Sequence, residues 1–332
     1  MFDLTPYNTF GLQVKSRDGV VITSVAELKR FHADSAIILG HGSDVLFTDD
    51  YDGSVLINQI QSLSVEKAEG DKFIVKAGSG LVLDDLIDSL IDKGIYGLEN
   101  LSAIPGTVGA APIQNVGAYG VEIGELIKSV VVYDLQRHIQ EEFTKEMCQF
   151  EYRSSYFKKN KSRQLLITQV IFELSSTFNP KLSYKGLKEE KFSDAKALRS
   201  KVVELRNKKL PDPSLVGNAG SFFKNPIVSN DLADRLKAQY EDMPTYPAQE
   251  GMTKLAAGWL IEKAGCKGIT HGNVGTWEHQ SLVIVNRGNA KPHEVVALAK
   301  YVMAEVFNTF NVKLEPEVRT FDSKGEVSWD NL

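Results

Sequence analysis

The chain has 332 residues, of which 42% are hydrophobic and 24% charged, and its formal net charge at pH 7 is −5. This is the composition of a globular protein, so we expect no long disordered region, and the length predicts two or three domains of roughly 150 residues each. The negative net charge argues against a protein that binds nucleic acid through bulk charge. An anionic ligand would need a few well-placed cations and main-chain amides.

Metal-dependent, secreted and membrane-spanning classes are disfavoured by other features. The two cysteines, Cys148 and Cys266, form no C-x-x-C pair, and the six histidines have no metal-ligand spacing, so we expect neither a disulfide framework nor a metal site. The N-terminus lacks a leader pattern, and no run approaches the ~20 apolar residues of a membrane span. We therefore expect a cytoplasmic protein with no membrane or nucleic-acid partner.

In the first third, short apolar runs alternate with glycine turns, which predicts strands within 36–47, 54–60 and 72–80. A helix should follow, because apolar residues then recur with the helical period until Gly94 ends the pattern. This apolar face consists of Leu83, Leu86, Ile87, Leu90 and Ile91.

The rest of the chain continues an α+β pattern. We place a domain boundary in 211–226, where three prolines and two glycines interrupt the periodicity. The predicted strands are 127–135, 164–175, 281–286 and 312–321. The predicted helices are 193–210, capped by Ser193 or Asp194, and 231–240, 252–265 and 291–310.

Residues 105–120 contain four glycines, three alanines, two prolines and no charged side chain. So much bare backbone suits a flat or anionic ligand held by main-chain N–H groups. Gly78-x-Gly80 and Gly40-x-Gly42 each follow a predicted strand, but both lack the third glycine of a Rossmann fingerprint. The three loops predict walls of one site for a flavin dinucleotide. The alternative for each loop is a tight turn.

Three other segments contain side chains that could take part in catalysis, and the first two are the cluster around Arg153 and the loop of Ser221. Arg153, in a cluster with Tyr152, Tyr156 and Lys158, could grip a carboxylate or enolate, although an ordinary surface turn would have the same composition. Ser221 lies between a glycine and two aromatic residues. It could deliver a proton in a dry site, or simply cap a helix or close a turn.

The last predicted strand has one polar and one apolar face. A period of two places Glu315, Glu317 and Arg319 on one face, opposite Leu314, Pro316 and Val318. A solvated, salt-bridged edge is the alternative to a catalytic role, and the proline favours an edge position.

In order along the chain, the strings "NTFG", "LGHGSDVL", "GLENLSAIPGTVGAAPIQNVGAYGVE", "YRSSYFK", "KLPDP", "GNAGSFFKNP", "KLAAGWLIE" and "LEPEVR" resemble the bacterial UDP-N-acetylenolpyruvoylglucosamine reductases, also called UDP-N-acetylmuramate dehydrogenases. The resemblance runs from about residue 8 to about residue 321. It implies an α+β fold: an FAD-binding domain of the vanillyl-alcohol-oxidase type, with two subdomains, and a separate α+β substrate-binding domain. The expected boundaries are 1–207, rejoined by 313–332, for the first domain and 208–312 for the second.

The resemblance also implies roles for individual residues. Those expected to surround non-covalent FAD are Gly40, Gly42, Ser43, Asp44, Val45, Ile104, Pro105, Gly106, Thr107, Gly109, Gln114, Asn115, Gly117 and Arg319. The catalytic set is Ser221 as proton donor, Arg153 and Glu317. Substrate contacts are expected at Tyr119, Tyr152, Tyr184, Lys209, Asn225, Tyr246, Lys254 and Gln280.

The implied activity is the reduction of UDP-N-acetylglucosamine enolpyruvyl ether to UDP-N-acetylmuramate for peptidoglycan. Hydride would pass from NADPH, a co-substrate, through flavin N5, and the protein would act as a monomer. Tyr184 marks the subtype in which a tyrosine loop folds over the substrate. Two alternatives stay open here: a related FAD oxidase, and a non-catalytic UDP-sugar-binding protein of the same fold.

Two positions depart from the family pattern. Asp44 stands where the family has asparagine, and because a carboxylate would repel a diphosphate, we expect its side chain to turn away and leave binding to the main chain. The loop "LSYKGL" differs from the commoner "L-x-YG-x-L" form, which affects the details of substrate closure.

Overall fold

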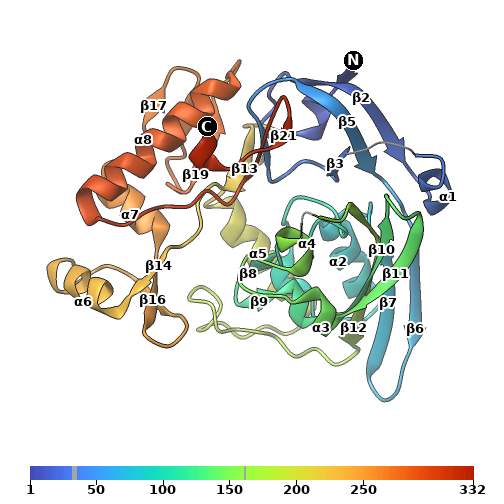
Figure 1. Ribbon diagram of the computed structural model, residues 1–332. Coiled ribbons are helices and arrows are strands. Elements are labelled where there is room, and N and C mark those ends of the chain that lie inside the picture. The colour runs from blue at the N-terminus through green and yellow to red at the C-terminus, as the bar shows by residue number, and fades with distance from the viewer. Residues whose placement is uncertain (32–35, 161) are drawn as a thin grey trace. The chain divides into compact units, whose positions relative to one another are not determined.

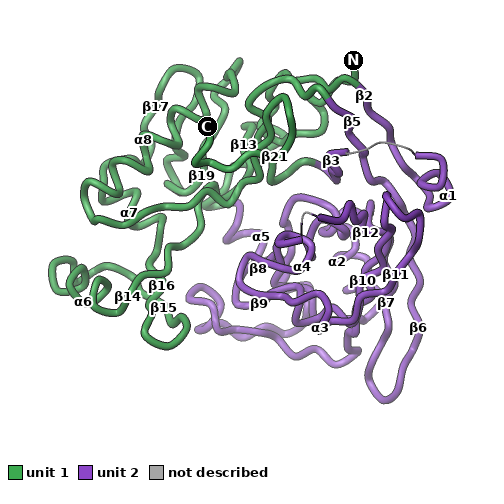
Figure 2. Tube along the Cα trace, viewed as in Figure 1, with its two compact units in different colours: residues 1–17, 42–52, 208–332 green, residues 18–41, 53–207 purple. Residues whose placement is uncertain are grey.

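The computed structural model describes residues 1–31, 36–160 and 162–332 (Figure 1). Its contacts divide the chain into two compact units (Figure 2). Unit 1 comprises Met1–Arg17, Gly42–Asp52 and Lys208–Leu332, and unit 2 comprises Asp18–His41 and Gly53–Asn207. Unit 1 thus contains two short N-terminal stretches as well as everything after residue 207. The assignment of cofactor and substrate functions to the expected domains stays a prediction.

Unit 2 is built on a five-stranded antiparallel sheet in the order β11-β10-β12-β7-β6. Its strands are β6 (Leu63–Lys67), β7 (Lys72–Gly78), β10 (Ile127–Asp134), β11 (Ile139–Thr144) and β12 (Leu165–Ser175). Helix α2 (Leu83–Asp92) packs on this sheet, and all five apolar residues predicted for its face are buried in the shared core. The predicted helix is therefore confirmed, and Gly94 follows it with a left-handed φ of 71°.

Other helices and strands complete unit 2. They are α1 (Val25–Leu28), β3 (Ala36–Leu39), η2 (Glu99–Leu101), β8 (Gly117–Ala118), β9 (Val121–Glu122), η3 (Ile123–Glu125), α3 (Lys145–Cys148), α4 (Tyr156–Lys159) and α5 (Ala195–Asn207). Two strands, β2 (Lys15–Ile22) and β5 (Tyr51–Asn58), run through points where the chain passes between units, and β3 pairs in parallel with β5. Of the two predicted caps for α5, Asp194 takes the role, because its Oδ1 accepts the Ala197 N–H at 2.8 Å.

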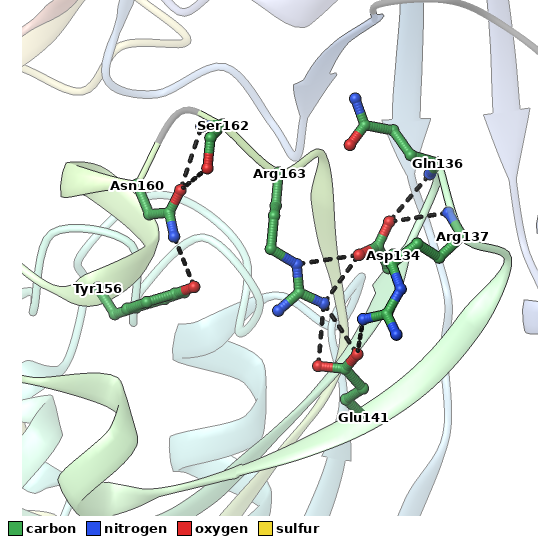
Figure 3. A network of polar contacts seen from close by, with 8 residues as sticks. All are labelled: Asp134, Gln136, Arg137, Glu141, Tyr156, Asn160, Ser162 and Arg163. Atoms are coloured by element: carbon green, nitrogen blue, oxygen red, sulfur yellow. Dashed lines mark hydrogen bonds and ion pairs between the residues drawn. The ribbon is translucent and has the colours of Figure 1, made fainter.

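A network of polar side chains stabilises one end of the five-stranded sheet of unit 2 (Figure 3). The Arg163 guanidinium donates to Asp134 Oδ2 at 2.8 Å and to Glu141 at 2.9 Å, while Asp134 Oδ1 accepts two main-chain N–H groups from the turn after β10. Burial by itself would raise the pKa of Asp134, but the Arg163 and main-chain hydrogen bonds outweigh it and hold that pKa below its usual value. The network joins β10 and β11 to the segment that follows α4.

Unit 1 contains three small sheets and three helices. The sheets have the orders β13-β19-β18-β17, β14-β16-β15 and β21-β20-β4, and β4 and β20 pair in parallel. The strands are β4 (Val45–Phe47), β13 (Asn218–Ser221), β14 (Ile227–Ser229), β15 (Thr245–Pro247), β16 (Met252–Leu255), β17 (Thr270–His271), β18 (Val274–Thr276), β19 (Val283–Asn286), β20 (Arg319–Asp322) and β21 (Gly325–Glu326), with β1 (Phe2–Asp3) paired to β2. The helices are α6 (Asn230–Gln239), α7 (Ala257–Lys263) and α8 (Pro292–Phe310), with short turns η1 (Thr5–Tyr7) and η4 (Trp329–Asn331).

Two predicted elements need correction. The helix expected over 252–265 begins only at Ala257, because residues 252–255 form β16, which pairs with a strand on each side. This cross-strand pairing overrides the helical apolar pattern. The strand expected over 312–321 exists only at Arg319–Asp322, although Leu314 and Val318 are buried as the alternation predicts. Pro316 cannot donate to a ladder, and it makes an isolated bridge to Phe223 instead.

None of the helices in the described ranges is long and apolar enough to cross a membrane. Within the same ranges, no three or more His, Cys, Asp or Glu side chains are grouped so as to hold a metal ion.

Candidate active site

The glycine loops of unit 2 interlock. The Gly109 N–H donates to Ser79 O at 2.8 Å, the Val108 N–H to Leu81 O at 2.9 Å, and the Leu83 N–H to Gly106 O at 3.1 Å. Residues 106–109 are therefore hydrogen-bonded to the loop that follows β7. Two of the three predicted loops therefore lie together, while their role as walls of one flavin site with the Gly40-x-Gly42 loop stays a prediction.

Close packing explains why particular positions in the loops are glycine. A Cβ on Gly109 would lie 2.4 Å from Ser79 Cβ, and a Cβ on Gly40 would lie 2.4 Å from Thr107 Oγ1. Both distances are shorter than real Cβ atoms tolerate, so close packing against Ser79 and Thr107, and not a turn with a positive φ, requires glycine at these two positions. The same packing brings together small, uncharged residues with main-chain groups between them, which fits a flavin ring beside a diphosphate.

Three predicted site residues of unit 2 have left-handed backbones. The φ angles are 48° at Asn115, 50° at Tyr119 and 52° at Arg153. Residues with a Cβ seldom adopt this conformation, and such strain gathers at binding and catalytic sites.

The side chain of Asn115 is bound within the protein. Its Nδ2 donates to Glu122 Oε2 at 2.6 Å and to Glu151 O at 3.1 Å, and its Oδ1 accepts the Gly124 N–H at 2.9 Å. Both ends of the carboxamide are thus used to hold the loop. The contact of Asn115 with FAD stays a prediction, and a contact through its main chain would leave these hydrogen bonds intact.

Arg153 is held against the same loop. Its Nη2 donates to Gly117 O at 3.0 Å, and its Cζ lies 5.2 Å from the centroid of the Tyr152 ring. A Cβ at Gly117 would come within 3.3 Å of Arg153 Nη1. Glycine at 117 therefore leaves room for this guanidinium.

Two predicted substrate residues of unit 2 pack together. The rings of Tyr119 and Tyr184 meet edge to face with centroids 4.8 Å apart. Burial raises the pKa of Tyr119 to about 12, against a smaller lowering by the Arg206 guanidinium. Asn100, which is buried, donates from Nδ2 to Tyr119 O and to Lys181 O at 2.8 Å each, so it ties the two tyrosine segments together.

In unit 1, two of the three catalytic candidates lie on adjacent extended segments. Ser221 ends β13 and pairs with Val283 of β19. The Glu317 N–H donates to Phe222 O, the next residue along from the serine, at 2.7 Å. Phe222 and Phe223, which follow the serine, are both buried, while a dry environment around the serine hydroxyl stays a prediction.

Four predicted substrate residues gather near the start of α7. Asn225 Oδ1 accepts the Ala257 N–H at 2.9 Å, and a Cβ on Gly258 would meet the Gln280 Oε1 at 2.9 Å. Tyr246 and Lys254 are directly opposed on β15 and β16, with the Lys254 Nζ 6.0 Å from the ring centroid.

The remaining predicted FAD residues of unit 1 lie along β4 and β20. Gly42 has a φ of 64°, and a Cβ there would lie 1.9 Å from Tyr7 O, so glycine is required. Val45 pairs with Arg319, whose N–H donates to Asp44 O at 3.2 Å and whose Nη2 donates to Glu326 at 3.1 Å. Ser43 is half-buried beside them, and Lys209 is exposed.

The predicted site residues fall into two sets, one in each unit. Unit 2 holds Arg153, Tyr119, Tyr152, Tyr184, Gly40 and the FAD residues of 104–117, namely Ile104, Pro105, Gly106, Thr107, Gly109, Gln114, Asn115 and Gly117. Unit 1 holds Ser221, Glu317, Gly42, Ser43, Asp44, Val45, Arg319, Lys209, Asn225, Tyr246, Lys254 and Gln280. The individual roles of these residues stay predictions.

Sequence reasoning overlooked the residues that support these sets. Asn100, Glu122 and Arg206 each contact a predicted site residue. A partial signal exists for Asn100 and Glu122, which lie inside the long string that resembles the family, whereas Arg206 lies outside the quoted strings.

Comparison with known proteins identifies the class and then the family. Residues 18–134 match the family description "FAD binding domain", and residues 212–321 match "UDP-N-acetylenolpyruvoylglucosamine reductase, C-terminal domain". The chain is therefore a flavoprotein with an FAD-binding domain and a separate C-terminal domain, as the predicted fold class requires. FAD is its cofactor.

Curated relatives make the family specific. The protein named UDP-N-acetylenolpyruvoylglucosamine reductase from Burkholderia ambifaria is 40% identical over 330 residues, covering 95% of this chain and 94% of its own length. The protein of that name from Neisseria gonorrhoeae is 39% identical over 328 residues, covering 95% of each chain. This chain belongs to the UDP-N-acetylenolpyruvoylglucosamine reductase family. The crystal structure of the reductase from Thermus caldophilus has the same fold, with a TM-score of 0.68 at 22% identity over 96% of each chain.

Proposed function

We propose that this protein uses NADPH and FAD to reduce UDP-N-acetylglucosamine enolpyruvyl ether to UDP-N-acetylmuramate, a precursor of peptidoglycan. The observation that carries the proposal is identity of about 40% over nearly the whole chain to curated reductases of that name. The pairing of the Ser221 and Glu317 segments supports it within this chain. We also expect a cytoplasmic monomer.

The neutral, closely packed glycine loops fit FAD, and the residues that would hold it are those of 104–117 with Gly40, and Gly42 to Val45 with Arg319. When bound, FAD supplies the carrier that takes hydride from NADPH and returns it to the enolpyruvyl double bond. The substrate's nucleotide and sugar would be held by the tyrosine pair of unit 2 and by the residues around the start of α7.

Arg153 would meet the negative charge that develops on the enolpyruvyl carboxylate as the hydride arrives, and Glu317 would assist as a protonated acid or through a partner group. A preorganised cation is worth most where water is excluded, because it needs no reorganisation at the moment of reaction. Ser221 would then give its hydroxyl proton to the other carbon of the former double bond, and a proton from solvent would restore the hydroxyl. General acid catalysis of this kind contributes ~10² to 10⁴ in rate.

The two half-reactions provide the test. In the FAD-bound protein, Ser221→Ala should still lose its flavin absorbance on addition of NADPH at the wild-type rate. Recovery of the absorbance on addition of the enolpyruvyl substrate should slow by ~10² to 10⁴. Ser214→Ala, which removes an exposed hydroxyl from the same loop region, is the matched control and should leave both rates unchanged.

Other outcomes would contradict parts of the proposal. Equal loss of both rates in Ser221→Ala would remove the serine from the proton-donor role. Reoxidation of the wild-type flavin by oxygen but not by the enolpyruvyl compound would indicate an oxidase. Binding of a UDP-sugar without any NADPH oxidation would indicate a non-catalytic protein. The full-length match to reductases disfavours both alternatives.

A further inference from the structure

Helix α4 carries a lysine, Lys158, that the proposed mechanism does not use. Its Nζ donates to Gln114 Oε1 at 3.1 Å and to the main-chain oxygen of Arg153 at 3.2 Å. One ammonium group therefore joins the loop predicted to contact FAD to the residue predicted to stabilise the enolate.

Arg153 depends on outside support because its backbone is left-handed, with φ at 52°. The hydrogen bond from Arg153 Nη2 to Gly117 O fixes the side chain. The peptide group that follows Arg153 is held twice, because its N–H, from Ser154, donates to Glu151 O at 3.0 Å and its carbonyl accepts from the Lys158 ammonium at 3.2 Å. A charged donor makes a stronger hydrogen bond than a neutral one.

The helix that presents Lys158 is anchored to another segment at its start and has an internal side-chain hydrogen bond at its end. At its start, Ser155 Oγ accepts the Lys158 N–H at 3.4 Å and donates to Ile113 O at 2.6 Å. At its end, Asn160 Nδ2 donates to Tyr156 Oη at 2.5 Å (Figure 3). The short helix is thus tied to the same loop that its lysine reaches, so the position of the ammonium is set by the fold.

We propose that Lys158 is a positioning residue for Arg153. Its ammonium holds the strained Arg153 peptide against the Gln114 loop and places a second positive charge beside the guanidinium's own main chain. This inference rests on the proposed function, because the charge that Arg153 would stabilise develops only when the enolpyruvyl substrate is reduced. If Lys158 only stabilised the fold, replacing it would slow both half-reactions alike.

The test compares three variants of the FAD-bound protein. Lys158→Met should lose flavin absorbance with NADPH at the wild-type rate but recover it with the enolpyruvyl substrate ~10- to 100-fold more slowly, as expected when a reacting group is misplaced. Lys158→Arg keeps the charge and several donors and should restore most of the lost rate. The matched control is Lys159→Met, which removes the same charge from the same helical turn, where Lys159 pairs with exposed Glu151 at 2.7 Å. It should change neither rate.

The inference is overturned if Lys158→Met slows both steps equally or slows neither, or if Lys158→Arg recovers nothing. If Lys158→Met does not retain FAD, Lys158→Arg decides. FAD retention with both rates close to their wild-type values supports the inference, and slowing of both rates by the same factor overturns it. Failure of the wild-type flavin to be reoxidised by the enolpyruvyl compound is a separate result, which would overturn the proposed function.

Discussion

Asn100 provides the sharpest test of how unit 2 is held together. Its Nδ2 donates two hydrogen bonds of 2.8 Å, to Tyr119 O and to Lys181 O, and the residue is only 2% exposed. Both partners are carbonyl oxygens, so only the amino end of the carboxamide can face them. The segment that carries Tyr184 is thereby joined to the Tyr119 turn.

The cost of Asn100→Ala follows from these contacts. Each hydrogen bond contributes about 0.5–1.5 kcal/mol, and a buried carbonyl left without a partner costs about 1–3 kcal/mol. The Tyr119 carbonyl would stay buried, whereas solvent can reach the exposed Lys181. We therefore expect the free energy of unfolding to fall by about 2–4 kcal/mol.

Denaturant unfolding at fixed FAD concentration measures this loss, and amide hydrogen exchange locates it. Exchange should accelerate in peptides covering 119–121 and 181–188, because those segments lose their tie. Asn308→Ala, on the exposed face of α8, is the control and should change stability by less than about 0.5 kcal/mol. Wild-type stability and unchanged exchange in Asn100→Ala would refute the reasoning.

Asn100→Asp adds a pH dependence with a definite sign. The new carboxylate would be buried against two carbonyl oxygens, so its folded-state pKa should lie above its unfolded value of about 3.9. The folded state then binds the proton more tightly than the unfolded state. The penalty relative to wild type should therefore be small near pH 4 and grow as pH rises through the folded pKa. A penalty independent of pH would contradict this account.

Three further predictions concern packing, charge and thiol chemistry. Gly109→Ala should lower the free energy of unfolding by about 1–3 kcal/mol and weaken FAD retention, because a Cβ there would lie 2.4 Å from a neighbouring side-chain carbon. Gel filtration with absorbance detection measures FAD retention. Unchanged retention would contradict the prediction. Arg163→Met should destabilise the protein by about 2–3 kcal/mol at neutral pH, because the buried Asp134 carboxylate loses its charged partner. Because the pKa of Asp134 is lowered in the folded state, the loss of unfolding free energy in Arg163→Met should be complete above the unfolded pKa of about 3.9 and should disappear as pH falls through the lower folded pKa. Denaturant unfolding at several pH values measures this loss. A loss that persists in acid would contradict the account. Cys148 and Cys266 are buried, and burial raises their pKa values to about 12 and about 11. Iodoacetamide should therefore label them at pH 8 only after unfolding, as measured by mass spectrometry. Labelling of the native protein would contradict this prediction.

Local patterns in the sequence predicted much of the secondary structure. The apolar period of α2 and the glycine at its end predict that helix because both signals involve residues only a few positions apart. The family strings likewise indicate the cofactor and the reaction, since they extend over nearly the whole chain. The alternation of Leu314 and Val318 predicted their burial correctly, but not the loss of the ladder at Pro316.

Tertiary structure alone decided what depends on partners far apart in the chain. Residues 252–255 became a strand because strands on both sides pair with them, and no local pattern reports such neighbours. Asn115 and Arg153 have left-handed backbones, and each also has a partner 36 positions away: Asn115 Nδ2 donates to Glu151 O, and Arg153 Nη2 donates to Gly117 O. The sequence by itself therefore determined the helical and strand periodicity and the family, while long-range packing decided which groups meet, because contact between distant residues depends on the folded path of the whole chain.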